Sequence, residues 1–226
     1  MLFGFLRKHL IVSIGSECYV TLPKGQIVPT HSAGDHPKAK IPQVPGGGHV
    51  LIVPITHYPT YATIPSDLAE PIYDETDKYK SALRAFYGKH HAHPVAFEVG
   101  RITAKGGHAH IQVVPVPTSI SADAIADTFT KEGSRLGIEF EYEEGDTRTP
   151  PGDRGYFKVD LPDGRRMVHW LKDGVPFGVQ FGRQVLVTLL GMPERFDWKE
   201  CEQSEEDDRQ DVQQFKDAFL AFDPSL

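Results

Sequence analysis

The stretch GHAHIQVVP, residues 107–115, carries the most information in this sequence. In an extended strand, side chains two residues apart share one face. His108, His110 and Gln112 therefore line one face, and the apolar residues that alternate with them pack behind. Three polar groups in a row on one face favour the wall of a polar pocket. The alternative is a strand with two surface histidines, because His-x-His is a short motif.

The residue types on this face suit the chemistry of phosphate esters. A neutral imidazole can attack phosphorus and form a covalent intermediate. The amide of Gln112 either donates to a phosphate oxygen or accepts from an imidazole and so fixes its tautomer. Backbone N–H groups at Gly106 and Gly107 offer further donors to an anion, and Lys105 is the nearest cation before the motif. We therefore expect Gly107 and Lys105 to contribute to substrate binding.

The flanking segments predict an α+β unit over residues 1–118. β-branched and apolar runs predict strands, and a stripe with helical spacing predicts a helix that begins near Pro71 and ends at Gly88. The run 95–100 is expected to pair with 108–114. The expected early strands are 9–15, 18–22 and 49–55, with a long loop at 30–48 that is rich in proline and glycine.

Residues 119–226 predict a second, smaller α+β unit, because the composition changes after Pro117. A helix is expected at about 122–132. Residues 138–144 alternate strictly, which predicts a half-buried strand with Ile138, Phe140 and Tyr142 on the buried side. Two strands at 156–161 and 165–171 resemble a hairpin. A last helix is expected after Ser204.

Composition limits the possible functions. The 226 residues carry a net charge of −7, with 39% hydrophobic residues, which excludes overall disorder. No apolar run reaches the ~18 residues that would span a bilayer, so we expect no membrane association. An acidic chain is not a bulk-charge binder of nucleic acid, and any RNA contact needs a local basic site. Two cysteines far apart indicate a reducing compartment.

The motif resembles that of the histidine-triad superfamily, and glutamine at its third polar position resembles the hexose-1-phosphate uridylyltransferase branch. The resemblance then extends over almost the whole chain. The segments HLIVSIG, HVLIVPITHYP, HIQVVPVP, GYFKVDLPDG and QFGRQVL resemble the CwfJ-type C-terminal region of spliceosome-associated proteins linked to the intron-lariat debranching enzyme. The resemblance implies a histidine-triad-like antiparallel sheet with helices, followed by a family-specific unit.

The resemblance also implies roles for single residues. His110 matches the nucleophilic middle histidine, Gln112 the phosphate-orienting third member, and His108 the first member. His49 matches a histidine near the substrate pocket. Arg183 in QFGRQ is a candidate for phosphate recognition because arginine reads phosphate with two donors; the alternative is a solvated arginine on a helix surface.

Two further residues leave alternatives open. His57 is eight residues from His49, and an extended strand would hold the two roughly 26 Å apart. They reach one phosphate only if the strand bends at Pro54. Glu98 either orients a pocket histidine or is a buried structural carboxylate.

The chain departs from the family pattern at its zinc ligands. The family usually has a Cys-x-x-Cys pair before HLIVSIG, and this chain has MLFGFL at residues 1–6. A tetrahedral site with two thiolates and two imidazoles needs that pair, and Cys18 alone does not replace it. We therefore assign no metal ligands and expect no cofactor.

The resemblance implies a nuclear RNA-processing factor that assists intron-lariat debranching. Its expected ligands are RNA or a nucleotide, and its expected partners are the lariat debranching enzyme or spliceosomal proteins. The alternative is an active nucleotide hydrolase or nucleotidyltransferase with His110 as covalent nucleophile. The residues do not decide between binding and catalysis, and a purely structural domain is a third interpretation.

Overall fold

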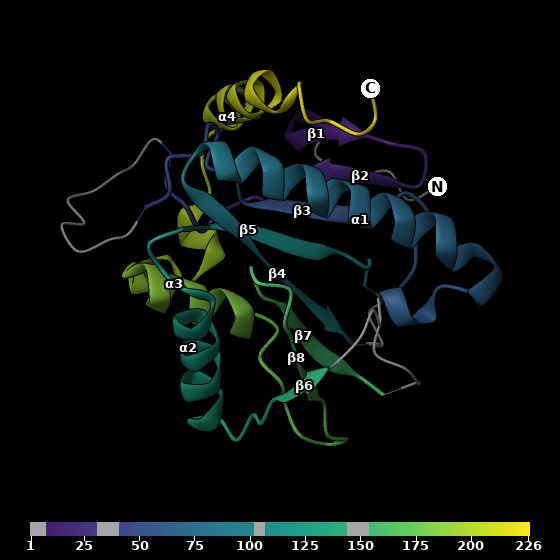
Figure 1. Cartoon of the computed structure of the whole chain (residues 1–226), viewed down its shortest axis with the longest axis vertical. Coiled ribbons are helices and arrows are strands. Elements are labelled where there is room, and N and C mark those ends of the chain that lie inside the picture. The colour runs from purple at the N-terminus through teal and green to yellow at the C-terminus, as the bar shows by residue number, and fades with distance from the viewer. Residues whose placement is uncertain (1–7, 31–40, 102–106, 144–153) are drawn as a thin grey trace.

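The computed structural model describes residues 8–30, 41–101, 107–143 and 154–226. Within these residues, one eight-stranded antiparallel sheet runs through the molecule in the order β1-β2-β3-β5-β4-β7-β8-β6 (Figure 1). The predicted α+β class with an antiparallel sheet is confirmed. The strands are β1 (Ile11–Ile14), β2 (Cys18–Thr21), β3 (Val50–Pro54), β4 (Ala92–Gly100), β5 (Ile111–Pro117), β6 (Glu141–Glu143), β7 (Tyr156–Asp160) and β8 (Arg166–Trp170).

Helices cover both faces of this sheet. In Figure 1, α4 lies beside β1 and α1, and α2 and α3 lie together on another side of the molecule. One buried core joins the sheet to α1 and α4, and a second core joins it to α2 and α3. The helices are α1 (Ser66–Lys89), α2 (Ala122–Ser134), α3 (Phe181–Leu190) and α4 (Glu205–Phe219). The 3-10 turns are η2 (Lys8–Leu10), η3 (Tyr61–Thr63), η4 (Pro193–Arg195) and η5 (Trp198–Cys201).

Strand β4 shows how one strand serves both cores. Successive side chains of a strand point to opposite faces. Ala92 and Ala96 join the core with α1, and Val95 and Phe97 join the core with α2 and α3. Burial on both faces explains the almost continuous apolar character of this strand.

The predicted division near residue 118 falls inside a continuous sheet. Strand β4 pairs with β5 on one side and with β7 on the other. Phe97 and Phe157 come from the two sides of residue 118, and their rings lie 6.2 Å apart. The two segments therefore share a sheet and a core, and the division into two units stays a prediction.

The predicted start of the first long helix at Pro71 is wrong. Helix α1 begins at Ser66 and contains Pro71 in its interior. A proline there cannot donate to the carbonyl four residues earlier, at Asp67. The residues before Pro71 are mostly exposed, so water can hydrate that carbonyl and the helix continues through the proline.

The predicted half-buried strand at 138–144 is only partly correct. Strand β6 spans only Glu141–Glu143. Ile138 is buried and Phe140 partly buried, but Tyr142 is 54% exposed. Strand β6 is the last strand of the sheet, and neither core includes Tyr142. The apolar alternation therefore continues beyond the point where the core ends.

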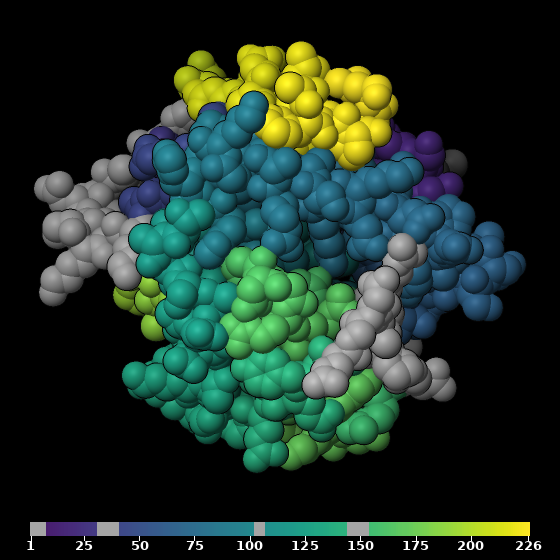
Figure 2. All heavy atoms as spheres, in the orientation of Figure 1, coloured from purple at the N-terminus to yellow at the C-terminus, as the bar shows by residue number. Residues whose placement is uncertain are grey.

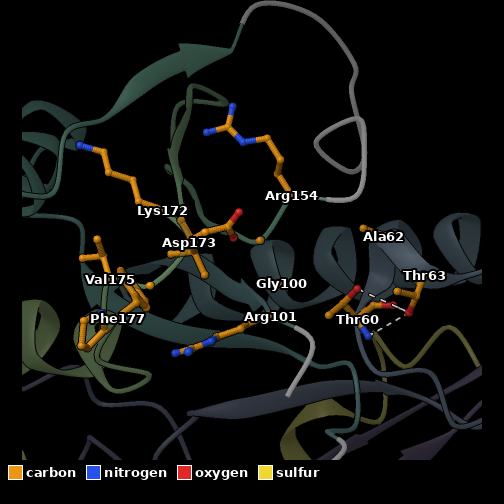
Figure 3. A pocket seen from close by; sticks show the side chains of 14 residues that line it. Thr60, Ala62, Thr63, Gly100, Arg101, Arg154, Lys172, Asp173, Val175 and Phe177 are labelled. Atoms are coloured by element: carbon orange, nitrogen blue, oxygen red, sulfur yellow. Dashed lines mark hydrogen bonds between the residues drawn. The ribbon is translucent and has the colours of Figure 1, made fainter. Parts of the chain in front are cut away.

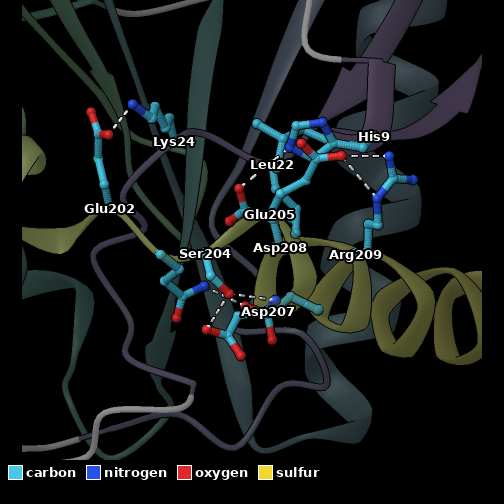
Figure 4. A network of polar contacts seen from close by, with 12 residues as sticks. His9, Leu22, Lys24, Glu202, Ser204, Glu205, Asp207, Asp208 and Arg209 are labelled. Atoms are coloured by element: carbon cyan, nitrogen blue, oxygen red, sulfur yellow. Dashed lines mark hydrogen bonds and ion pairs between the residues drawn. The ribbon is translucent and has the colours of Figure 1, made fainter.

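The C-terminal helix returns to the first strands of the chain. Helix α4 starts after Ser204, as predicted, and the Ser204 hydroxyl accepts a backbone N–H of the first turn at 3.1 Å. Asp208 contacts His9 at 3.4 Å, and Glu202 pairs with Lys24 (Figure 4). In the space-filling view the C-terminal residues lie against α1 (Figure 2). The two ends of the described chain thus stabilise each other.

Candidate functional site

A cavity of about 490 Å³ lies on the face of the sheet that α3 covers. Its walls come from the segment before β3, from β5 and the residues before it, from α3 and from η5. The cavity brings together seven residues that sequence reasoning selected: His49, Glu98, Gly107, His108, His110, Gln112 and Arg183. Lys105 lies outside the described residues.

His49 and Gln112 form the floor of this cavity. Leu51 pairs directly with Gln112 across β3 and β5, so His49, two residues earlier, is its diagonal neighbour on the same face. The Nε2 of His49 lies 3.2 Å from Oε1 of Gln112. The backbone N–H of Ile27 donates to Nδ1 of His49 at 3.1 Å. Both ring nitrogens are therefore occupied by protein groups.

These contacts fix the protonation state of His49. Its side chain is buried, and burial lowers the pKa of His49 to about 3, helped by the positive charge of Arg183. The ring is therefore neutral at physiological pH. Because Nδ1 accepts from Ile27, the proton sits on Nε2 and is donated to Gln112. The amide oxygen of Gln112 is thereby held, and its NH₂ group is left as a donor for a ligand.

His110 presents an imidazole with one nitrogen held and one free. Its Nδ1 lies 2.8 Å from the backbone carbonyl of His108. A carbonyl only accepts, so Nδ1 carries the proton of the neutral ring and the lone pair lies on Nε2. His110 is exposed at the cavity. This arrangement is the one that an imidazole needs for attack on phosphorus or for accepting a proton.

His108 is held more tightly than His110. Its Nε2–H donates to the carbonyl of Pro54 at 2.8 Å. Its ring centroid lies 4.8 Å from that of exposed His57. Burial lowers the pKa of His108. A neutral His108 joins the last residue of β3 to the segment before β5 and so supports the loop that carries His110.

The strand that carries the motif begins later than predicted. Strand β5 starts at Ile111, so His108 and His110 precede it. The segment still follows the sheet because the N–H of Ala109 donates to the carbonyl of Tyr58 at 2.7 Å. Ala109, Ile111 and Val113 are buried behind the motif, as predicted.

Arg183 is buried, and its guanidinium donates hydrogen bonds to other protein groups. It donates to the carbonyls of Arg195 and Gly25, each at 2.8 Å, and to the carbonyl of Gln26 at 3.4 Å. It also contacts the sulfur of Cys201 at 3.2 Å. The interpretation as a solvated surface arginine is wrong, because α3 turns Arg183 into the protein. Its predicted role in phosphate binding stays a prediction, and these bonds favour a positioning role.

Glu98 is a buried carboxylate whose hydrogen bond and ion pair go to Tyr156 and Lys158 rather than to a histidine of the motif. It accepts from the hydroxyl of Tyr156 and lies 3.2 Å from Nζ of Lys158. Both Glu98 and Lys158 are 2% exposed. The charge is thus compensated inside the protein, and these contacts favour the structural interpretation of Glu98.

Comparison with known proteins assigns the chain to a family. A sequence model described as "Protein similar to CwfJ C-terminal" matches residues 5–130, and one described as "Protein similar to CwfJ C-terminus 2" matches residues 136–224. The chain belongs to the CwfJ C-terminal family. The first match ends at residue 130 and the second begins at residue 136; the predicted division near residue 118 stays a prediction.

Relatives match this CwfJ-type chain over nearly its whole length. CWF19-like protein mug161 of Schizosaccharomyces pombe is 33% identical over 95% of this chain and 36% of its own length. CWF19-like protein 1 of Xenopus laevis is 34% identical over 98% and 37%. Zinc finger CCCH domain-containing protein 64 of Arabidopsis thaliana is 32% identical over 97% and 34%. The chain therefore spans about a third of the length of these relatives.

Solved structures with some likeness include a hypothetical histidine triad nucleotide-binding protein from Sulfolobus tokodaii. It is 12% identical, with a TM-score of 0.38 over 94% of this chain and 84% of that one. A Hit-like protein from Bartonella henselae is 14% identical, with a TM-score of 0.32 over 48% of this chain and 70% of that one.

The described residues of this CwfJ-type chain hold no grouping of three His, Cys, Asp or Glu side chains that fits a metal ion. Cys18 is a free, buried thiol beside Thr76, and burial raises the pKa of Cys18 to about 12. Within the same residues, no helix has the length and apolar character required to cross a membrane.

Sequence reasoning missed the residues that hold His49 in place. Arg195 donates to the carbonyls of Ile27 and Gln26, at 2.7 Å and 2.9 Å. With Arg183 it anchors the loop whose Ile27 N–H binds His49. No sequence signal identifies these bonds, because their acceptors are backbone carbonyls, which every residue carries.

Proposed function

We propose that this chain is an RNA-processing factor of the nuclear splicing machinery that assists intron-lariat turnover, and that its cavity binds a nucleotide or an RNA phosphate. Membership of the CwfJ C-terminal family supports the splicing role. Proteins named CWF19-like contain this region within longer chains. The lariat debranching enzyme or a spliceosomal protein is the proposed partner.

One observation supports the phosphate-binding cavity above all others. The amide of Gln112 lines the cavity, and its oxygen accepts from Nε2–H of His49, so its NH₂ group is left to donate to a ligand. His110 lines the same cavity, with its Nδ1 held by the carbonyl of His108. A phosphate oxygen can accept from this amide while the phosphorus faces His110.

The binding function is tested by placing a negative charge on the floor of the cavity. Gln112→Glu keeps the size of the side chain and can still accept from His49, but its carboxylate repels a phosphate. We expect the affinity for adenosine or guanosine 5′-monophosphate, measured by calorimetry, to fall tenfold or more. The control is Gln214→Glu on the exposed face of α4, which adds the same charge elsewhere. Equal affinities for both variants would contradict phosphate binding at Gln112.

A second candidate function is hydrolysis or transfer of a nucleotidyl group. In this reaction Nε2 of His110 attacks phosphorus, a P–N bond forms, and the bond to the leaving oxygen breaks. The leaving oxygen takes a proton from solvent. Water or an acceptor hydroxyl then attacks the same phosphorus, loses its proton, and releases the neutral imidazole. The free nitrogen of His110 supports this candidate, because binding alone does not require it.

The covalent step is tested by intact mass spectrometry after brief incubation with adenylated and guanylated substrates. We expect a nucleotide-sized mass increase on the wild type, its absence in His110→Ala, and its retention in the exposed control His91→Asn. An adduct on His110→Ala would remove His110 as the nucleophile. No adduct and no turnover across the substrates would favour the binding function.

The role in lariat turnover has its own measurement. Purified lariat debranching enzyme is supplied with a branched RNA that contains a 2′–5′ linkage, with and without this chain. We expect the chain to raise the debranching rate, and Gln112→Glu to reduce that gain. An unchanged rate together with no binding to either the enzyme or the branched RNA would contradict this role.

A further inference from the structure

A second cavity, of about 540 Å³, adjoins the one that contains His110. Thr60 and Arg101 line both cavities. The second cavity continues past the ends of β4 and β8 to the loop at 172–177 (Figure 3). A ligand longer than one nucleotide can therefore extend from the first cavity into the second.

The second cavity is locally basic, although the whole chain carries a net charge of −7. Its described lining contains Arg101, Arg154 and Lys172 against a single carboxylate, Asp173. Figure 3 shows Arg154 and Lys172 on one side of Asp173 and Arg101 on the other. The sequence requires a local basic site for any RNA contact, and this lining supplies one.

The three cations are available to a ligand. All three are exposed, and none forms an ion pair with a carboxylate of the residues that the structure describes. The guanidinium of Arg154 lies over the ring of Trp170, 5.2 Å from its centroid. Such stacking orients the planar group while its N–H donors remain open to phosphate.

The wall of the second cavity also offers apolar surface. Val175 and Pro176 lie in the loop beside Lys172, and Val175 is 55% exposed. Trp198, 36% exposed, lies at the first cavity. Grooves that bind single-stranded nucleic acid combine cations along the backbone with aromatic rings against which bases stack, and Trp198 is such a ring. The two cavities together have both components.

We propose that the second cavity binds a phosphate next to the one held at His110, so that the site takes a single-stranded oligoribonucleotide in preference to a lone nucleotide. This inference rests on the proposed phosphate-binding function of the first cavity. Arg154 and Lys172 hold the backbone of the neighbouring nucleotide, and Arg101 lies at the junction of the two cavities.

The test compares adenosine 5′-monophosphate with a four-residue adenylate strand that carries a 5′-phosphate. We expect the wild type to bind the strand at least tenfold more tightly than the monophosphate. The variant Arg154→Gln/Lys172→Gln should lose this advantage and keep its affinity for the monophosphate; Arg101 is left unchanged because it lines both cavities. Each lost phosphate contact should reduce the slope of log affinity against log salt by about 0.7.

Two further variants separate this effect from a general loss of charge or of folding. Lys78→Gln/Lys131→Gln removes two exposed positive charges from α1 and α2, and we expect it to keep the preference for the strand. Asp173→Asn removes the single carboxylate of the described lining, and we expect it to bind the strand several-fold more tightly.

The outcomes distinguish the two proposals. If the wild type binds neither the monophosphate nor the strand, the proposed function itself fails. If it binds both equally, or if the double variant keeps the preference for the strand, the second phosphate site is overturned. Tighter binding of a four-residue glutamate peptide than of the strand would also overturn it, in favour of an acidic protein partner.

Discussion

The backbone N–H of Ile27 donates to Nδ1 of His49 across 3.1 Å. This bond determines which nitrogen of His49 carries the proton, and through it the orientation of the Gln112 amide. Because Nδ1 accepts, the opposite nitrogen of His49 donates to Gln112. The orientation of the Gln112 amide therefore depends on a loop that lies 22 residues before His49 in the sequence. A protonated His49 could not accept from Ile27, so acid breaks this chain of bonds at its first member.

The stability of the protein should depend on pH through His49. Burial lowers the pKa of His49 to about 3 in the folded state, whereas an unfolded histidine has a pKa of about 6.5. Below pH 6.5 the unfolded state binds more protons, so stability is lost as the pH falls. Between pH 6.5 and 5 this loss amounts to about 2 kcal/mol. Urea unfolding at both pH values measures it.

A variant that cannot titrate at position 49 isolates this contribution. His49→Gln should lose about 2 kcal/mol less than the wild type over the same pH interval, whatever its stability at neutral pH. The exposed His57→Gln should keep the wild-type difference because His49 is still present. Identical acid sensitivity in His49→Gln and the wild type would show that His49 is not held neutral.

Replacement of Arg183 by lysine should destabilise the protein although the charge is kept. The guanidinium reaches the carbonyls of Gly25, Gln26 and Arg195 at once, and an ammonium group cannot span all three. Buried carbonyls that lose their donors cost about 2–4 kcal/mol in total. Arg209→Lys, at an exposed pair within α4, should change the unfolding free energy by less than about 0.5 kcal/mol. Equal effects of the two substitutions in denaturant unfolding would contradict the positioning role.

The sequence predicted the parts of the cavity that depend on local pattern. Alternation in the stretch 107–115 placed Ala109 and Ile111 in the core. The resemblance to the CwfJ-type region placed His49 near His110, and both line one cavity. The sequence could not predict that Arg183 and Arg195 anchor a loop, because their acceptors are backbone carbonyls that have no side-chain signature.

Errors in the predicted elements have a common physical origin. A local pattern says which face of a segment is apolar, but tertiary packing decides where the element ends. Proline is a good first helical residue, yet α1 starts five residues before Pro71 because solvent can hydrate the carbonyl that it frees. Tyr142 continues an apolar alternation beyond the point where the core ends. The sequence also did not predict the second, basic cavity, because its cations Arg101, Arg154 and Lys172 are far apart in the sequence.

Removing one charge of the buried pair Glu98 and Lys158 should reduce the free energy of unfolding more than replacing both charges with neutral side chains. Lys158→Met removes the cation beside Glu98 and leaves its carboxylate buried with the hydroxyl of Tyr156. We expect a loss of about 3–5 kcal/mol. Glu98→Gln/Lys158→Met removes both charges and should recover at least 1 kcal/mol of that loss. Chemical denaturation of the two variants measures the difference. If the double variant were less stable than Lys158→Met, Lys158 would not be the main partner of the Glu98 carboxylate.

The tautomer of His110 provides a measurement that needs no substrate. The carbonyl of His108 holds Nδ1 of His110 at 2.8 Å, so the neutral ring should carry its proton on Nδ1 and its lone pair on Nε2. Long-range nitrogen–proton NMR correlations at about pH 8.5, where an ordinary imidazole is neutral, distinguish the two tautomers. Because the acceptor belongs to the backbone, His108→Ala should leave this tautomer unchanged while it removes the side-chain bond to Pro54. A proton on Nε2 would place the lone pair on the nitrogen that faces the protein, and His110 could then act as neither nucleophile nor base toward a ligand in the cavity.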